Sequence, residues 1–168
     1  MEIYTREPPT RRTTDRIKVG IADFAVGDDE STLSTSGLGS CVGIALYDPG
    51  AGVVGLAHAM LPAGEGKTDV AKYVDTAVDA LVDAMEAEGA SRRRLVAKLA
   101  GGSTMFEFKS AEESVGDRNV EAARETLAAL HIPIEAEDVG GDHGRSLRLD
   151  GETGTLHVRS ASAGRQTL

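Results

Sequence analysis

The chain contains one cysteine, Cys41, and the residues around it are of the types that a cysteine nucleophile needs. Cys41 follows a glycine-rich run and precedes an apolar stretch, 42–47. Seventeen residues later His58 lies in a second apolar stretch, 53–60, and only a turn-forming segment, 48–52, separates the two stretches. A thiol becomes a strong nucleophile when an imidazole can take its proton. The spacing therefore predicts a cysteine and a histidine on two neighbouring strands.

The register of the predicted hairpin decides whether the two side chains can meet. If Asp48 and Val53 are opposite each other at the turn, Gly43 faces His58, and Cys41 lies on the same sheet face one diagonal step away. Tightening the register by two residues would place thiol and ring directly opposite. A one-residue bulge would instead move them to different faces.

A structural role is the alternative for both residues. A lone cysteine beside an apolar strand is more often a small buried hydrophobe, and His58 could equally be a core histidine bonded to backbone. Gly37 and Gly39 favour catalysis, because glycine permits positive φ and close backbone approach just before the thiol. The N–H groups of Ser40 and Cys41 would then face a developing oxyanion, so Gly39 and Ser40 are predicted to support the nucleophile.

Other kinds of site find little support. The pair Gly37 and Gly39 lacks the third glycine of a dinucleotide-binding fingerprint. The remaining histidines have no metal-ligand spacing with one another or with Cys41, so no metal and no other cofactor is expected. A formal charge of −9 argues against nucleic acid as a partner. Five lysines beside thirteen arginines suit a salt-rich cytoplasm, although a moderately acidic mesophilic protein has a similar composition.

Hydrophobic periodicity predicts the elements that must position the pair. Two amphipathic helices are expected, over 69–88 and 117–130. Strands are expected over 17–26 (with a bulge), 32–35, 41–48, 53–60, 94–100, 132–139, 145–149 and 155–159, several of them in hairpins. The fold class is therefore α/β: a layered mixed α/β sandwich with largely antiparallel sheets and two main helices.

The length of 168 residues favours one domain. Residues 1–15 lack periodicity and are expected to be a mobile arm, 16–160 to form the catalytic domain, and 161–168 to be a tail. No apolar run is long enough to span a bilayer, and the N-terminus lacks the apolar core of a secretory signal. A cytoplasmic location without membrane insertion is expected, where the thiol stays reduced.

Several motifs resemble those of one family, the CheD chemoreceptor glutamine deamidases. They run in a consistent order from about residue 17 to 159, and they read STSGLGSCVGIALYDP, GLAHAMLP, GKTDVAKYVDTAV, AKLAGGSTMF, GDRNVEAARETL and EDVGGDHGRSLRL. The resemblance implies a Cys-His-Thr triad, in which the nucleophile maps onto Cys41, the histidine onto His58 and the threonine onto Thr35. It also implies a layered α/β sandwich.

The resemblance implies a reaction and two partners. Cys41 would attack the carboxamide of a receptor glutamine, ammonia would leave, and water would hydrolyse the thioester to glutamate. The substrate would be the methylation region of a chemoreceptor, a cytoplasmic helical bundle, and a CheC-type phosphatase would be a second partner. One alternative is that the chain serves mainly as a regulatory binding module for that phosphatase. Another is a cysteine peptidase or a transglutaminase-like acyl transferase.

Overall fold

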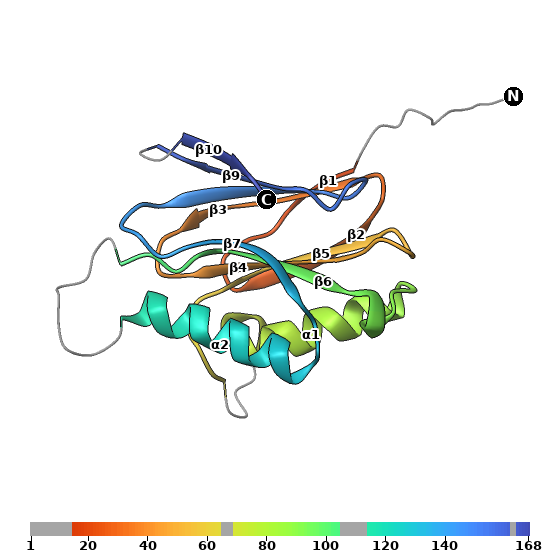
Figure 1. The fold of residues 1–168 in the computed structure, drawn as a ribbon, viewed down its shortest axis with the longest axis horizontal. Coiled ribbons are helices and arrows are strands. Elements are labelled where there is room, and N and C mark those ends of the chain that lie inside the picture. The colour runs from red at the N-terminus through yellow and green to blue at the C-terminus, as the bar shows by residue number, and fades with distance from the viewer. Residues whose placement is uncertain (1–14, 65–68, 105–113, 162–163) are drawn as a thin grey trace, which may run out of the picture.

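The computed structural model describes residues 15–64, 69–104, 114–161 and 164–168. Within this part the chain forms ten strands and two α-helices, arranged in three layers (Figure 1). The expected arm lies outside the described residues except for Asp15, which begins the first strand. No helix of the described part is long and apolar enough to cross a membrane.

Two five-stranded sheets form two of the layers. The outer sheet has the order β1-β3-β8-β9-β10, and the central sheet has the order β2-β5-β4-β6-β7. The strands are β1 (Asp15–Lys18), β2 (Asp23–Asp28), β3 (Ser31–Leu38), β4 (Val42–Asp48), β5 (Val53–Ala59), β6 (Val96–Gly101), β7 (Ile134–Val139), β8 (Arg145–Asp150), β9 (Leu156–Ser160) and β10 (Gly164–Thr167). Parallel pairing occurs between β1 and β3 and between β6 and β7; the other strand pairs are antiparallel. The predicted layered sandwich with largely antiparallel sheets is confirmed.

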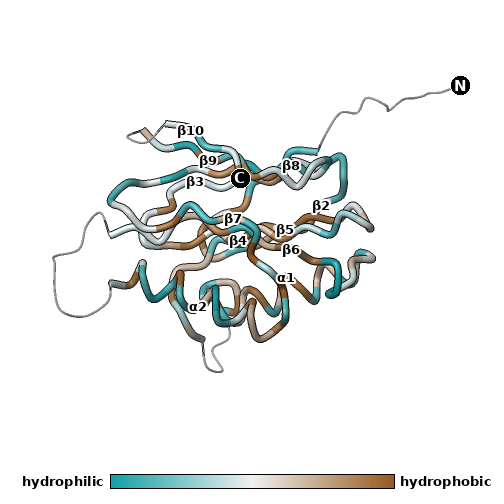
Figure 2. Tube along the Cα trace, viewed as in Figure 1, coloured by the Kyte–Doolittle hydropathy of each residue, from teal (hydrophilic) through white to brown (hydrophobic). Residues whose placement is uncertain are grey.

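The helices form the third layer and cover the face of the central sheet that points away from the outer sheet (Figure 1). They are α1 (Val74–Ala87) and α2 (Val115–Ala129), with short 3-10 turns η1 (Val70–Lys72) and η2 (Arg92–Arg94). One apolar core fills the space between helices and central sheet, and a second fills the space between the two sheets. Figure 2 shows hydrophobic segments gathered in the central sheet. Because this sheet is covered on both faces, β4 and β5 are apolar almost without interruption.

The predicted strand over 17–26 is wrong as a single element. The segment divides into β1 and β2, which belong to different sheets. A turn separates them, and Ala22 has φ 59. The change of parity in the apolar pattern therefore reflects a passage between layers, because each half turns its apolar side toward a different core.

The predicted helix over 69–88 is interrupted at Tyr73, which has φ −108 and ψ 135. The reason is tertiary: the N–H of Met60 donates to the carbonyl of Lys72, and the N–H of Val74 donates to that of Leu61. These bonds hold the segment in extended pairing with the chain after β5, so the helix begins only at Val74. One further strand, β10, lies in the expected tail and pairs with β9.

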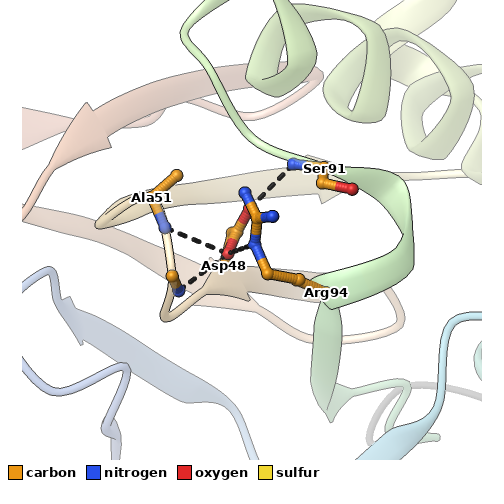
Figure 3. A network of polar contacts seen from close by, with 5 residues as sticks. Asp48, Ala51, Ser91 and Arg94 are labelled. Atoms are coloured by element: carbon orange, nitrogen blue, oxygen red, sulfur yellow. Dashed lines mark hydrogen bonds and ion pairs between the residues drawn. The ribbon is translucent and has the colours of Figure 1, made fainter.

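The turn of the β4–β5 hairpin is held by Asp48, whose side chain is fully buried (Figure 3). One carboxylate oxygen accepts from the N–H groups of Gly50 and Ala51 and from Nε of Arg94, and the other accepts from the N–H of Ser91 at 2.7 Å. Burial alone would raise the pKa of Asp48, but Arg94 and the three backbone donors outweigh it and lower the pKa to about 2. The hairpin that carries Cys41 and His58 is thus fixed at its far end.

Candidate active site

The β4–β5 hairpin has the predicted register. Asp48 pairs with Val53, and Gly43 pairs with His58. Cys41 lies one residue before β4 and packs against the core between the two sheets. Since His58 is directly opposite Gly43, Cys41 is its diagonal neighbour, a separation that side chains of this size can bridge.

The second sheet supplies a hydrogen-bond partner for the histidine. Thr35 lies on β3, and its side chain points between the sheets, where Oγ1 is 2.8 Å from Nδ1 of His58. The same hydroxyl donates to the carbonyl of Val19 at 2.7 Å. A hydroxyl has one hydrogen, so toward His58 it must accept, and Nδ1 must carry the proton. This tautomer leaves Nε2 with a free lone pair.

Burial favours the neutral form of both side chains, those of His58 and Cys41. The side chain of His58 is fully buried, and burial lowers its pKa. Cys41 is half-buried and free, and burial raises the pKa of its thiol, only partly offset by the N–H of Cys41 itself. The resting site therefore contains a thiol and a neutral imidazole.

The structure does not join these two groups by a hydrogen bond. Nε2 of His58 is buried and has no hydrogen-bond partner in the described part of the chain. Thr35 and His58 are thus brought into contact, whereas Cys41 shares their face without being bonded to the ring. Hydrogen bonds of this kind are often long in a substrate-free site and tighten when substrate binds.

Hydrogen bonds to three consecutive carbonyls fix residues 39–41, which we call the nucleophile loop after its candidate nucleophile, Cys41. The carbonyl of Gly39 accepts from the N–H of Ser103, and the carbonyl of Cys41 accepts from the N–H of Gly102, each at 2.8 Å. The carbonyl between them, that of Ser40, accepts from Nδ2 of Asn119 at 2.8 Å. The loop therefore lies against the end of β6 and against α2.

Glycines permit this close packing at particular positions. Gly37 has φ 76 and turns the chain into the loop, as predicted, whereas Gly39 is not among the residues with positive φ. A Cβ on Gly101, which has φ 110, would collide with the carbonyl oxygen of Cys41. A Cβ on Gly43 would collide with Leu147 of the outer sheet. Because Gly43, opposite His58, has no side chain, the two sheets can approach closely at this position.

Sequence reasoning missed Asn119. Its side chain is fully buried, and Nδ2 donates both to the carbonyl of Ser40 and to that of Met60 at 2.9 Å. One amide group therefore ties the nucleophile loop to the strand end that follows His58. The available signal was a polar residue on the inward face of the predicted helix, next to Val120, since an asparagine buried among apolar residues must bond to something.

Comparisons with known proteins identify one family that the chain resembles. Residues 60–160 match the family model described as CheD chemotactic sensory transduction. The chain is 47% identical to a probable chemoreceptor glutamine deamidase CheD of Haloarcula marismortui, over all of both chains. It is also 47% identical to the chemoreceptor glutamine deamidase CheD of Halalkalibacterium halodurans, over 92% of this chain and 99% of that protein.

A solved structure shares the fold at low sequence identity. The crystal structure of a Neisseria meningitidis protein superposes with a TM-score of 0.50 at 14% identity, over 77% of this chain and 63% of that one. This likeness concerns the layered sheets alone. The family model matches more than half of the chain, and the relatives match nearly all of it at 47% identity. These matches show that the chain belongs to the CheD family.

Proposed function

We propose that this protein is a chemoreceptor glutamine deamidase, with Cys41 as nucleophile, His58 as base and Thr35 as the group that orients His58. The names of the relatives support the reaction. The observation that carries the residue assignment is the bond between Thr35 and His58, which leaves Nε2 unprotonated on the sheet face that Cys41 shares.

The neutral resting pair implies general-base catalysis. Because burial disfavours both the thiolate and the imidazolium, proton transfer from Cys41 to Nε2 of His58 accompanies attack on the substrate. The sulfur forms a bond to the carboxamide carbon of a receptor glutamine, and the carbonyl π electrons move to oxygen. The hydroxyl of Thr35 keeps accepting from Nδ1 and so stabilises the imidazolium that forms.

Collapse of the tetrahedral adduct releases ammonia. The C–N bond breaks, and His58 returns its proton to the leaving nitrogen, which leaves a thioester on Cys41. Water then attacks the thioester with His58 again as base, and glutamate and the free thiol result. The N–H groups of Ser40 and Cys41 are the proposed donors to the developing oxyanion, with Gly39 and Ser40 supporting the nucleophile, and the bonds to the carbonyls of residues 39–41 keep this backbone in place.

The test is site-resolved mass spectrometry of a receptor cytoplasmic fragment incubated with the protein. Wild type is expected to replace NH2 by OH at glutamine side chains and to leave the chain whole. Cys41→Ala should lower the rate below about 10⁻⁴ of wild type, and His58→Asn by about 10²–10⁴-fold. Thr35→Val should cost about tenfold, the equivalent of one neutral hydrogen bond.

Glutamine conversion by Cys41→Ala at the wild-type rate would refute the assignment. The same spectra separate the rival reactions, since a peptidase would shorten the receptor and an acyl transferase would attach an amine to it. A CheC-type phosphatase remains a proposed partner. If binding this phosphatase is a role separate from deamidation, the folded Cys41→Ala protein should still bind the phosphatase.

A further inference from the structure

The outer sheet has a concave groove on its solvent-facing side, and its lining includes Thr35. Its volume is about 790 Å³, and β1, β3, β8, β9 and β10 all contribute to its lining. Along these strands the buried residues alternate with exposed ones: Leu147 and Val158 point into the core, whereas Arg148 and Arg159 point outward. Solvent-facing side chains of the sheet therefore line the groove, together with the inward-facing positions Val19, Thr35, Leu147 and Val158 of the same strands.

Cationic side chains gather in this groove. Lys18, Arg148, Arg159 and Arg165 line it and are exposed, and the lining contains no aspartate or glutamate. Within residues 15–64, 69–104, 114–161 and 164–168 none of the four forms an ion pair. In the rest of the sequence fourteen lysines and arginines stand beside 27 acidic residues. The groove thus has the opposite sign to the protein as a whole.

The strand register places these charges against one another. Arg159 on β9 is directly opposite Arg165 on β10. Like charges in opposite positions destabilise a sheet. With so many acidic residues in the chain and none in the lining, the arrangement suits an anionic partner that supplies the missing negative charge.

The spacing of the charges favours a protein surface over a single phosphate. The four cationic residues stand on four different strands, and neighbouring strands are about 4.8 Å apart, so β1 and β10 are separated by roughly 19 Å along the sheet. Carboxylates four residues apart on a helix are separated by about 6 Å along its axis. A helical surface with several carboxylates therefore matches the groove better than one compact anion does.

The groove continues toward the nucleophile loop. A second hollow, of about 390 Å³, shares Ser146 and Arg159 with the groove and reaches Gly37, which precedes the loop. We propose that the groove docks an acidic helical surface of the receptor substrate, so that a glutamine beyond the docked segment lies at Cys41. This inference rests on the proposed function. It fits the product as well, because each conversion to glutamate adds a carboxylate to the receptor surface.

The experiment measures binding and turnover separately. Binding of a purified cytoplasmic helical fragment of a chemoreceptor is measured by calorimetry with the Cys41→Ala protein, and turnover by ammonia release with Cys41 intact. The groove variant is Arg148→Glu with Arg159→Glu. The control, Arg93→Glu with Arg118→Glu, makes the same charge change at exposed arginines of η2 and α2, in another layer.

The groove variant is expected to weaken receptor binding at least about tenfold and to raise KM with kcat unchanged. The control should stay within about twofold, since distant surface charges are screened by salt. The groove variant should unfold at or above the wild-type temperature, because Arg159→Glu faces Arg165, and both variants should keep the wild-type rate of Cys41 alkylation by iodoacetamide. Added salt should weaken receptor binding by the Cys41→Ala protein more than receptor binding by the Cys41→Ala protein that also carries the two groove substitutions.

Equal effects of the two charge reversals, or no effect of the groove variant, would overturn docking at the groove. So would a groove variant that keeps receptor binding but loses binding to phosphatidylglycerol vesicles, because the groove would then serve an anionic membrane. A wild-type protein that binds the receptor through the groove without releasing ammonia would leave the docking proposal standing and refute the deamidase.

Discussion

At the scale of single residues, the proposed chemistry depends on which nitrogen of His58 carries the proton. The hydroxyl of Thr35 settles this, because its only hydrogen is donated to the carbonyl of Val19. The imidazole is therefore oriented by a neutral group, and burial lowers its pKa. An aspartate at position 35 would instead raise the pKa of the ring and favour a charged pair with Cys41.

The neutral pair predicts how Cys41 responds to pH. Burial raises the pKa of the thiol, so its alkylation by iodoacetamide should accelerate through neutral pH and still be rising above about pH 8.5, the ordinary value for a free thiol. Turnover should behave differently. Since the pKa of His58 is lowered, kcat/KM should stay level through neutral pH and fall only on the acid side of about 6.5.

Stopped-flow alkylation between pH 5 and 10 checks the first expectation, and ammonia release over the same range checks the second. An alkylation rate that is high and independent of pH between about 6 and 7 would reveal a preformed thiolate–imidazolium pair. Thr35→Val is a useful comparison, because it removes the partner of Nδ1 and leaves the position of Cys41 in the sheet unchanged.

At the scale of elements, α2 acts on the site through Asn119. Replacing Asn119 by Ala leaves the part-buried carbonyls of Ser40 and Met60 without this donor, and each lost hydrogen bond costs about 0.5–1.5 kcal/mol. A loosened nucleophile loop should also slow the chemical step. The expected result is a kcat about 10- to 100-fold lower with a nearly unchanged KM.

The control is Val120→Ala, a buried apolar truncation at the next position of the same helix. It should lower the unfolding temperature but leave kcat within about twofold when both proteins are assayed fully folded. If the two variants lose kcat in proportion to their loss of stability, Asn119 acts as an ordinary core residue and positions nothing.

The β4–β5 hairpin depends on Asp48 in a similar way. Asp48→Asn removes the charge from four hydrogen bonds, and bonds to a charged group are worth about 1.5–3 kcal/mol, so the free energy of unfolding should fall by about that much. Arg94→Ala should have a smaller effect, because that side chain is half exposed and the three backbone donors remain.

Acid titration gives an independent check on Asp48. Its folded pKa, about 2, lies below the ordinary value of about 3.9, so its contribution is fully present above pH 4. That contribution is lost as the pH falls from about 4 through 2. Urea unfolding at several pH values should show wild type losing more stability across this window than Asp48→Asn. Parallel curves for the two proteins would contradict the prediction.

At the scale of the whole molecule, the site lies between layers that are distant in sequence. Thr35 belongs to the outer sheet, whereas Cys41 and His58 belong to the hairpin of the central sheet, and Asn119 comes from the helical layer. The proposed docking groove is lined by β3 through Ser34, Thr35 and Ser36, and the side chain of Thr35 also contacts His58. One strand thus connects the two sites.

Much of this arrangement is encoded locally. The apolar stretches and the turn between them predict the β4–β5 hairpin with its register, because the alternation of side chains and the short turn allow few other pairings. The two helices follow from their apolar stripes, although tertiary hydrogen bonds shorten the first. The face shared by Cys41 and His58 was predictable for the same reason, since residues two apart on a strand point the same way.

Only the tertiary structure decided the contacts between layers. That the segment 17–26 divides between two sheets, that Thr35 donates to Val19, and that Asn119 holds the nucleophile loop all depend on how separate elements pack. The basic groove is also invisible in the sequence, because its four cationic residues are spread from position 18 to position 165 and are brought together by strand order. Local patterns determine which face a residue takes, whereas packing determines what that face meets.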